Sequence, residues 1–356
     1  MKKGIKNWSK LVFFLYLFLF SINLIKRASI ALAPNINNFL IENFNPIKAV
    51  CVGWFTTAIA QSSGAVGTIT ATFAGSNLIS LSTAVYILIG SALGTTITAL
   101  IISLVIISNK RKDFRHGFEI GLSYAIYSAL IVIIGFLLEY FFNFFSKISF
   151  SLAKFSESRI AFLQIPDFVG LITDPILNVL FNYTNLIFIL FLGFLILILD
   201  LKYLSKSIIA IFGGEEKTRK FINKYFDSKY KAYFLGVILT AIVFSSSITI
   251  GLLVPLAVAR VINLKKAIPF IIGADLGTST DLFLATLIIG KTNALATAFA
   301  YALIPLLGAL IFLPNTNILH RITKYTSKKL IHISRKKALY ILLAFILIPL
   351  LVIWIF

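Results

Sequence analysis

Hydroxyl and amide side chains stand in two short clusters inside otherwise apolar stretches. The first polar cluster is Gln61-Ser62-Ser63, and the second polar cluster is Ser245-Ser246-Ser247. Each is followed by a glycine stretch, 90–96 in the first case and 273–279 in the second, that also carries hydroxyls. A hydroxyl can donate a hydrogen bond to an oxyanion or offer its oxygen to a cation such as Na⁺. We therefore expect these clusters to bind small ions.

The two clusters belong to a repeat with a constant offset of 183 residues. Aligning 61–106 on 244–289 needs no gap and matches 13 of 46 positions. Two copies with interrupted apolar helices are typical of secondary transporters. The interruptions matter because irregular backbone at membrane depth is tolerated only where it lines a cavity in the protein.

The composition predicts an all-α polytopic membrane protein. The chain is 59% hydrophobic and 13% charged, whereas soluble domains have about 25% charged residues. Its single cysteine, Cys51, excludes an internal disulfide, and its three histidines stand among basic loop residues, so we expect no metal cofactor. The net charge of +20 is concentrated in short loops. This pattern indicates cytoplasmic loops and not nucleic-acid binding.

Long apolar stretches predict seven membrane spans: 8–33, 84–108, 116–142, 185–213, 267–290, 293–313 and 338–356. Residues 1–33 also resemble a signal peptide that ends at Ala31-Leu32-Ala33. Because the repeat matches 8–30 with 191–213, far from the start of the chain, we expect a retained first helix.

Equivalent loops of the two copies carry opposite charge. Three loops, 34–46, 77–83 and 292–298, have no Lys or Arg, whereas their equivalents 217–229, 260–266 and 109–115 have five, three and four. If basic loops stay in the cytoplasm, the copies are inverted, with the N-terminus inside and the C-terminus outside.

The same rule predicts a re-entrant hairpin in each copy. Segment 232–259 has no charged residue over 28 positions, yet basic residues flank both of its ends. One crossing would place one basic group outside, so we expect a hairpin with its tip near 244–247. Segment 49–76 would form the equivalent hairpin, with its tip near 61–64. The alternative is two ordinary long helices, each with one flank that disobeys the charge rule.

These patterns divide the chain into four parts. We expect a first inverted repeat at 1–145, an exterior linker at 146–184, a second repeat at 185–328, and a basic loop with a C-terminal transmembrane helix at 329–356. The spans that hold the glycine stretches are each expected to be broken.

Asp275 and Asp281 are ionisable residues at predicted membrane depth, where such groups are functional candidates. They are six residues apart, so an unbroken helix would point them to different sides, and a break at Gly277 would bring both toward one cavity. The alternative is a structural or protonated carboxylate. Asp200, beside Lys202, is expected to reach the membrane surface.

The Gln-Ser-Ser cluster followed by a Gly-x-x-x-Gly-Thr-Thr stretch, with the pair repeated, resembles the type II sodium/phosphate cotransporter family over roughly 8–142 and 191–325. The resemblance implies inverted repeats, hairpin tips at the polar clusters, and Na⁺-driven phosphate uptake. It implies a site lined by Gln61, Ser62, Ser63, Thr95, Thr96, Ser245, Ser246, Ser247, Thr278 and Ser279. Asp275 and Asp281 join this site by their depth, and with Thr278 they are the Na⁺ candidates.

The chain departs from the family pattern at four positions. Gly64 stands where the family has serine, Phe244 where it has glutamine, and Ala92 and Asp275 where it usually has asparagine. The mechanism class is unaffected, but the identity of the anion and the number of Na⁺ ions stay open.

The sequence thus predicts a Na⁺-coupled symporter of inorganic phosphate, or of a similar small anion, in the cell membrane. Its expected partners are these ions and the bilayer, and a homodimer is left open. The alternatives are an uncoupled channel and a Na⁺-coupled transporter of a different anion. A membrane-embedded enzyme is less favoured, because only Asp275 and Asp281 remotely resemble a catalytic pair.

Overall fold

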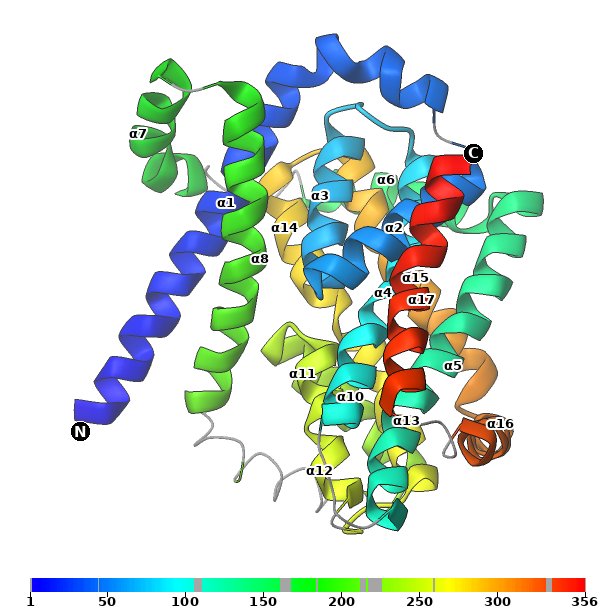
Figure 1. Ribbon diagram of the computed structural model, residues 1–356. Coiled ribbons are helices and arrows are strands. Elements are labelled where there is room, and N and C mark those ends of the chain that lie inside the picture. Colours follow the sequence, from blue (N-terminus) through cyan, green and yellow to red (C-terminus); the bar gives the residue numbers. More distant parts are fainter. Residues whose placement is uncertain are drawn as a thin grey trace.

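The computed structural model describes residues 2–43, 45–105, 111–160, 168–183, 185–211, 216, 226–258, 260–330 and 335–355. Within these residues every regular element is a helix, which confirms the predicted all-helical class. Most long helices run along one direction as a bundle (Figure 1). Helix α1 (Lys2–Asn43) begins at one end of this bundle, and α17 (Arg335–Ile355) finishes at the other end.

Five helical segments are long and apolar enough to cross a bilayer. They are Asn7–Ile25 within α1, Leu81–Ser103 within α4 (Leu81–Val105), Arg115–Phe142 within α5 (Arg111–Phe142), Leu264–Ile289 across α13 (Leu264–Gly277) and α14 (Ser279–Ile289), and α15 (Thr292–Phe312). Five of the seven predicted spans are therefore confirmed by length and composition. The other two coincide with α8 (Leu186–Ile211) and α17, whose described apolar parts are shorter, so those spans stay predictions.

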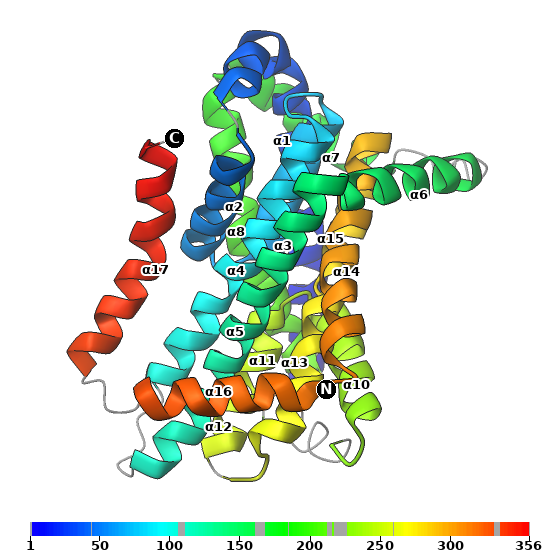
Figure 2. The same ribbon diagram turned by 90° about the vertical axis from the view of Figure 1, so that its right-hand side faces the viewer.

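Helix boundaries recur at the offset found in the sequence. Helix α2 (Pro46–Ala60) corresponds to α10 (Lys229–Val243), and α3 (Ser63–Gly75) corresponds to α11 (Ser246–Gly251) together with α12 (Leu253–Val258). Helices α2 and α3 lie in one half of the bundle, and α10, α11 and α12 lie in the other half (Figure 1 and Figure 2).

Glycines let equivalent helix pairs pack backbone against backbone. Helix α2 packs on α4, and α10 packs on α13. A Cβ atom at Gly90 would overlap the carbonyl oxygen of Val50, and one at Gly273 would overlap that of Tyr233. Glycine is required at both positions because no side chain fits between the helices.

The predicted break in each glycine-rich span is wrong for the first copy. Helix α4 continues through residues 90–96 without interruption. In the second copy only Thr278 separates α13 from α14, and it keeps helical dihedral angles, φ −63° and ψ −26°. In these spans the glycines permit close packing between neighbouring helices, and this role does not require a break in the helix.

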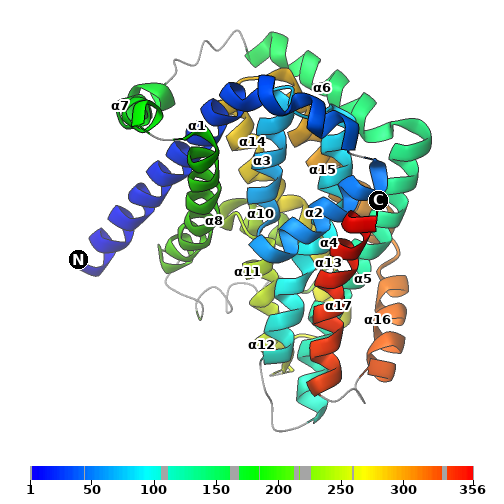
Figure 3. The same cartoon turned by 45° about the horizontal axis from the view of Figure 1, so that its top comes forward.

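The remaining helices lie around this bundle. Helices α6 (Phe144–Ile160) and α7 (Phe168–Tyr183) lie at its periphery, well apart from each other (Figure 3). Helix α16 (Thr316–Leu330) lies across the end of the bundle, nearly perpendicular to the long helices (Figure 2). Ser327 of α16 donates a hydrogen bond of 3.0 Å to Glu119 of α5, which also accepts one of 2.9 Å from Arg115. This buried carboxylate fastens α16 to α5.

Candidate functional site

The first polar cluster lies where α2 ends and α3 begins. Gln61 ends α2 in the left-handed conformation, with φ 54°, and its side chain is exposed. A residue with a Cβ pays about 1–2 kcal/mol for this conformation, so the surrounding structure must hold it. Ser62 caps α3, its hydroxyl accepting a 3.1 Å hydrogen bond from the Ala65 N–H. Ser63 is buried in the first turn of α3.

The second polar cluster has the same backbone geometry, 183 residues later. Phe244 ends α10 in the left-handed conformation, with φ 58°. Ser245 caps α11 by accepting a 3.3 Å hydrogen bond from the Ile248 N–H. Ser246 and Ser247 are buried. The cap is thus common to both copies, whereas the residue that ends the preceding helix differs.

Asp275 of α13 lies beside the second polar cluster, and Tyr124 of α5 connects the two. The Tyr124 hydroxyl donates a 2.9 Å hydrogen bond to Asp275 Oδ1 and lies 3.4 Å from Ser246 Oγ. Tyr124 has no exposed surface, whereas Asp275 is partly buried. Two predicted site residues are therefore brought together by a tyrosine that was not predicted.

Asp281 of α14 lies against the first polar cluster. A Cβ atom at Gly64 would overlap Asp281 Oδ2, so the carboxylate fills the space that a side chain at position 64 would need. Oδ1 accepts a 2.7 Å hydrogen bond from the Leu282 N–H. Oδ2 is buried and has no hydrogen-bond partner among the described residues. This contact explains physically why position 64 requires glycine.

Tyr301 of α15 lies near residues from both halves of the site. Its hydroxyl lies near the Ser63 side chain and near both Asp281 and Asp275. The two aspartates lie against different polar clusters, as expected for residues six apart on a nearly continuous helix. The break at Gly277 that would have brought them together is not needed.

The hydroxyls of the two glycine stretches are turned toward their own helices. Thr95, Thr96, Thr278 and Ser279 are all buried. Each donates a hydrogen bond to a backbone carbonyl three or four residues earlier, at 3.0, 2.8, 3.1 and 2.7 Å respectively. Because their protons are used in this way, these hydroxyls offer a ligand only oxygen lone pairs. Such oxygens suit a cation better than an oxyanion.

Sequence reasoning missed Tyr124 and Tyr301. The signal available was a phenolic hydroxyl inside a long apolar span, a polar atom that needs a partner at that depth. The expectation for Asp200 was wrong. Its side chain is only 2% exposed, and neither carboxylate oxygen has a hydrogen-bond partner among the described residues. Asp200 faces the interior and does not reach the surface.

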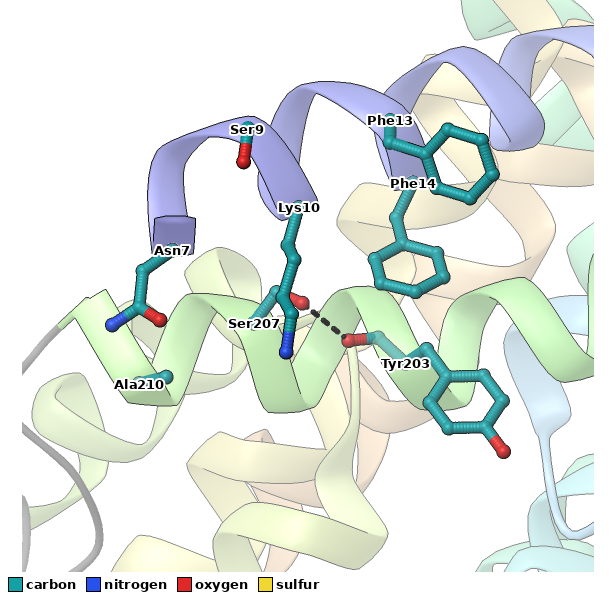
Figure 4. A pocket seen from close by; sticks show the side chains of 8 residues that line it. All are labelled: Asn7, Ser9, Lys10, Phe13, Phe14, Tyr203, Ser207 and Ala210. Carbon is teal, nitrogen blue, oxygen red and sulfur yellow. Dashed lines mark hydrogen bonds between the residues drawn. The ribbon is translucent and has the colours of Figure 1, made fainter. Parts of the chain in front are cut away.

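A cavity of about 560 Å³ opens between α1 and α8. It is lined by Phe13, Phe14 and Tyr203, with Lys10 and Asn7 at one end (Figure 4). No residue of either polar cluster lines it, so it is separate from the candidate site.

The site therefore combines buried hydroxyls, two carboxylates and two capped helix starts. Carboxylate and hydroxyl oxygens bind hard cations, and hydroxyls and N–H groups at helix starts bind anions. Together with the apolar helices, this defines a multi-pass membrane protein with an interior polar site. The chain belongs to the Na⁺/Pi-cotransporter family, whose sequence model matches residues 17–162 and again 189–333. The family resemblance predicted from the motifs is thereby confirmed.

Relatives of known name agree with this assignment. The chain is 24% identical to sodium-dependent phosphate transport protein 2A of Ovis aries over 94% of its own length and 65% of that protein. It is 24% identical to the same protein of Rattus norvegicus, over 95% and 66%. It is also 30% identical to the uncharacterized protein YqeW of Bacillus subtilis, over 30% of this chain and 36% of that one.

The chain spans slightly less than two thirds of the length of the phosphate transport proteins that it matches. No solved structure matches it. The family is one of transporters, and Na⁺ is the coupling ion that its description names.

Proposed function

We propose that this chain is a secondary active transporter that couples Na⁺ entry to the uptake of inorganic phosphate. The observation that carries the proposal is that each serine-capped helix start has its own aspartate. Asp281 lies against Gly64, and Asp275 reaches Ser246 through Tyr124. A carboxylate beside an anion site raises the free energy of the bound anion, unless a cation neutralises the carboxylate. A requirement for bound Na⁺ before the anion binds is a physical basis for coupling.

The proposed topology is two inverted repeats, each with a re-entrant hairpin. Helices α2 and α3 have 15 and 13 residues, which is short of the roughly 20 that a bilayer requires. Their position in one half of the bundle, with α10, α11 and α12 in the other half, supports hairpins that enter from opposite sides (Figure 1). The protein would lie in the cell membrane, and its N-terminus would lie in the cytoplasm.

The proposed ion site uses residues from both copies. The buried serines, Ser63, Ser246 and Ser247, have the hydroxyls that would contact the anion. The capping serines, Ser62 and Ser245, shape the two tips. Thr95, Thr96, Thr278 and Ser279 would supply oxygens to cations, with Asp275 and Asp281 as the charged ligands. Gln61 would reach the site from the first tip.

Phosphate uptake into proteoliposomes tests the proposal. The purified protein is reconstituted, and entry of radiolabelled phosphate is followed with an inward Na⁺ gradient and with an equal K⁺ gradient. We expect accumulation above equilibrium only with Na⁺, and none in protein-free liposomes. Entry that is equally fast in K⁺ would indicate an uncoupled pore. Na⁺-driven uptake that excess sulfate suppresses better than excess phosphate would indicate a different anion.

A further inference from the structure

Within the candidate site, Asp281 is the carboxylate whose surroundings compensate its charge least. Its side chain is 1% exposed, and Oδ2 has no hydrogen-bond partner among the described residues. A single N–H, that of Leu282, reaches Oδ1 at 2.7 Å. An ionised carboxylate removed from water costs several kcal/mol unless it is paired. Some positive group must therefore meet Oδ2 when Asp281 is ionised.

The start of α3 supplies part of that positive charge. Gly64 is the second residue of α3, a helix of 13 residues, and the carboxylate lies directly against it. The helix dipole places roughly half a positive charge near the first turn. This field favours the ionised form of Asp281 over the protonated form. The helix start does not neutralise the carboxylate, so a mobile cation is still needed to do so.

Other oxygens border the same position. Ser63 precedes Gly64 in the first turn of α3, and the Tyr301 hydroxyl lies near the Ser63 side chain. Hydroxyl and carboxylate oxygens are the ligands that small hard cations take. Glycine at position 64 is what leaves room for the carboxylate, because any side chain there would overlap Oδ2.

We propose that Asp281, lodged against Gly64 with the hydroxyls of Ser63 and Tyr301 beside it, is the primary Na⁺ site of this chain. This inference rests on the proposed Na⁺-coupled function. It assigns the coupling Na⁺ ion to one carboxylate, that of Asp281. Asp275 is the weaker candidate, because it is only partly buried and the Tyr124 hydroxyl donates to its Oδ1 at 2.9 Å. The Gly64 and Asp281 pair then acts as one unit, in which the size of residue 64 sets the position of the ligand oxygen.

Na⁺ binding without phosphate tests the site directly. The full chain in detergent is titrated with ²²Na⁺, and its unfolding temperature is measured in NaCl and in choline chloride at equal ionic strength. We expect Asp281→Asn to weaken Na⁺ binding at least tenfold and to abolish the rise in unfolding temperature with Na⁺. Asp200→Asn is the matched control. Asp200 is also buried with unpartnered oxygens, but it lies on α8, so Na⁺ binding should be unchanged.

A double-mutant cycle tests the role of Gly64. Gly64→Ala should weaken Na⁺ binding, because the new Cβ displaces the carboxylate. Adding Gly64→Ala to Asp281→Asn should weaken it no further. Should Gly64→Ala not elute as a single species, Asp281→Asn alone decides the question.

Two results would overturn the site: wild-type Na⁺ affinity in Asp281→Asn, or an unfolding temperature that responds to pH and not to Na⁺. Na⁺ binding that depends on Asp281 in a protein without phosphate uptake would support the site and refute only the proposed transport. Na⁺-driven uptake with unchanged Na⁺ affinity in Asp281→Asn would refute the site and leave the transport proposal intact.

Discussion

Tyr124 gives Asp275 a partner where the lipid offers none. Its hydroxyl donates to the carboxylate at 2.9 Å and lies 3.4 Å from Ser246. Hydrogen bonds to charged groups contribute about 1.5–3 kcal/mol. We expect Tyr124→Phe to keep the fold, to reduce phosphate uptake roughly tenfold or more by that energy, and to change its dependence on Na⁺. The measurement is initial uptake against Na⁺ and phosphate concentration.

Tyr127→Phe is the control for this change. Tyr127 is also fully buried in α5, but its hydroxyl donates to the Pro305 carbonyl, 3.4 Å away. Its loss should leave the Na⁺ dependence as it is in the wild type. Equal effects of the two substitutions would mean that Tyr124 contributes packing alone.

The buried serines at the two helix starts should be reachable by the transported anion. In a Cys51→Ser background, we expect Ser63→Cys and Ser246→Cys to transport phosphate until a small methanethiosulfonate reagent blocks them. Phosphate with Na⁺ should slow the block, because the anion occupies the same place. Ser80→Cys, at an exposed position before α4, should be modified without loss of transport. Full activity after complete modification of both cysteines would remove the polar clusters from the pathway.

At the scale of elements, the glycine stretches act first as contact surfaces. A Cβ at Gly90 would overlap the backbone of α2, so Gly90→Ala must push α4 away. We expect a loss of about 1–3 kcal/mol, typical of overpacking, seen as a lower unfolding temperature. Gly135→Ala is the control, since its Cβ would meet only Phe145 and Ile89 atoms at 3.6 and 3.8 Å. Equal stability of Gly90→Ala and Gly135→Ala would show that the two helices separate freely.

The elements themselves were largely readable from the sequence. The offset of 183 residues predicted corresponding segments, and α2 and α10 begin and end at positions that differ by that number. Five spans followed from apolar length alone. The predicted break in the first copy failed, because a glycine in a span serves close packing as readily as a turn. Which of the two applies depends on the neighbouring helix.

The contacts within the site were not readable in this way. That Asp281 fills the space beside Gly64 depends on how α14 packs on α3, and these helices are over 200 residues apart in the chain. The same holds for Tyr124 and Asp275, which are separated by 151 residues. Asp200 was misjudged because its neighbour Lys202 suggested the surface, whereas the rotation of α8 turns the carboxylate inward.

At the scale of the whole molecule, the basic helix α16 lies at the end where α1 begins. Helix α16 lies across that end (Figure 2). Leu319, Thr323 and Ser327 are buried against the bundle. Ile318, Ile322 and Tyr325 are exposed apolar residues, and Arg321, Lys328 and Lys329 are exposed and basic. The exposed side of α16 mixes apolar and basic residues, with the Lys329 ammonium 4.5 Å from the Tyr325 ring centre, which suits a helix at a membrane surface. Basic residues at this end agree with the proposed cytoplasmic side, because basic loops stay in the cytoplasm.

The proposed inverted topology gives the last prediction. Single cysteines in the Cys51→Ser background are treated with a membrane-impermeant thiol reagent in whole cells and then in opened cells. We expect Ser80→Cys and Lys291→Cys to react from outside, and Lys266→Cys and Asn315→Cys only after opening. All four positions are exposed. Ser80 and Lys266 decide the matter, because they lie in equivalent loops of the two copies, before α4 and at the start of α13. If both react from the same side, the copies are parallel, and hairpins entering from opposite faces are excluded.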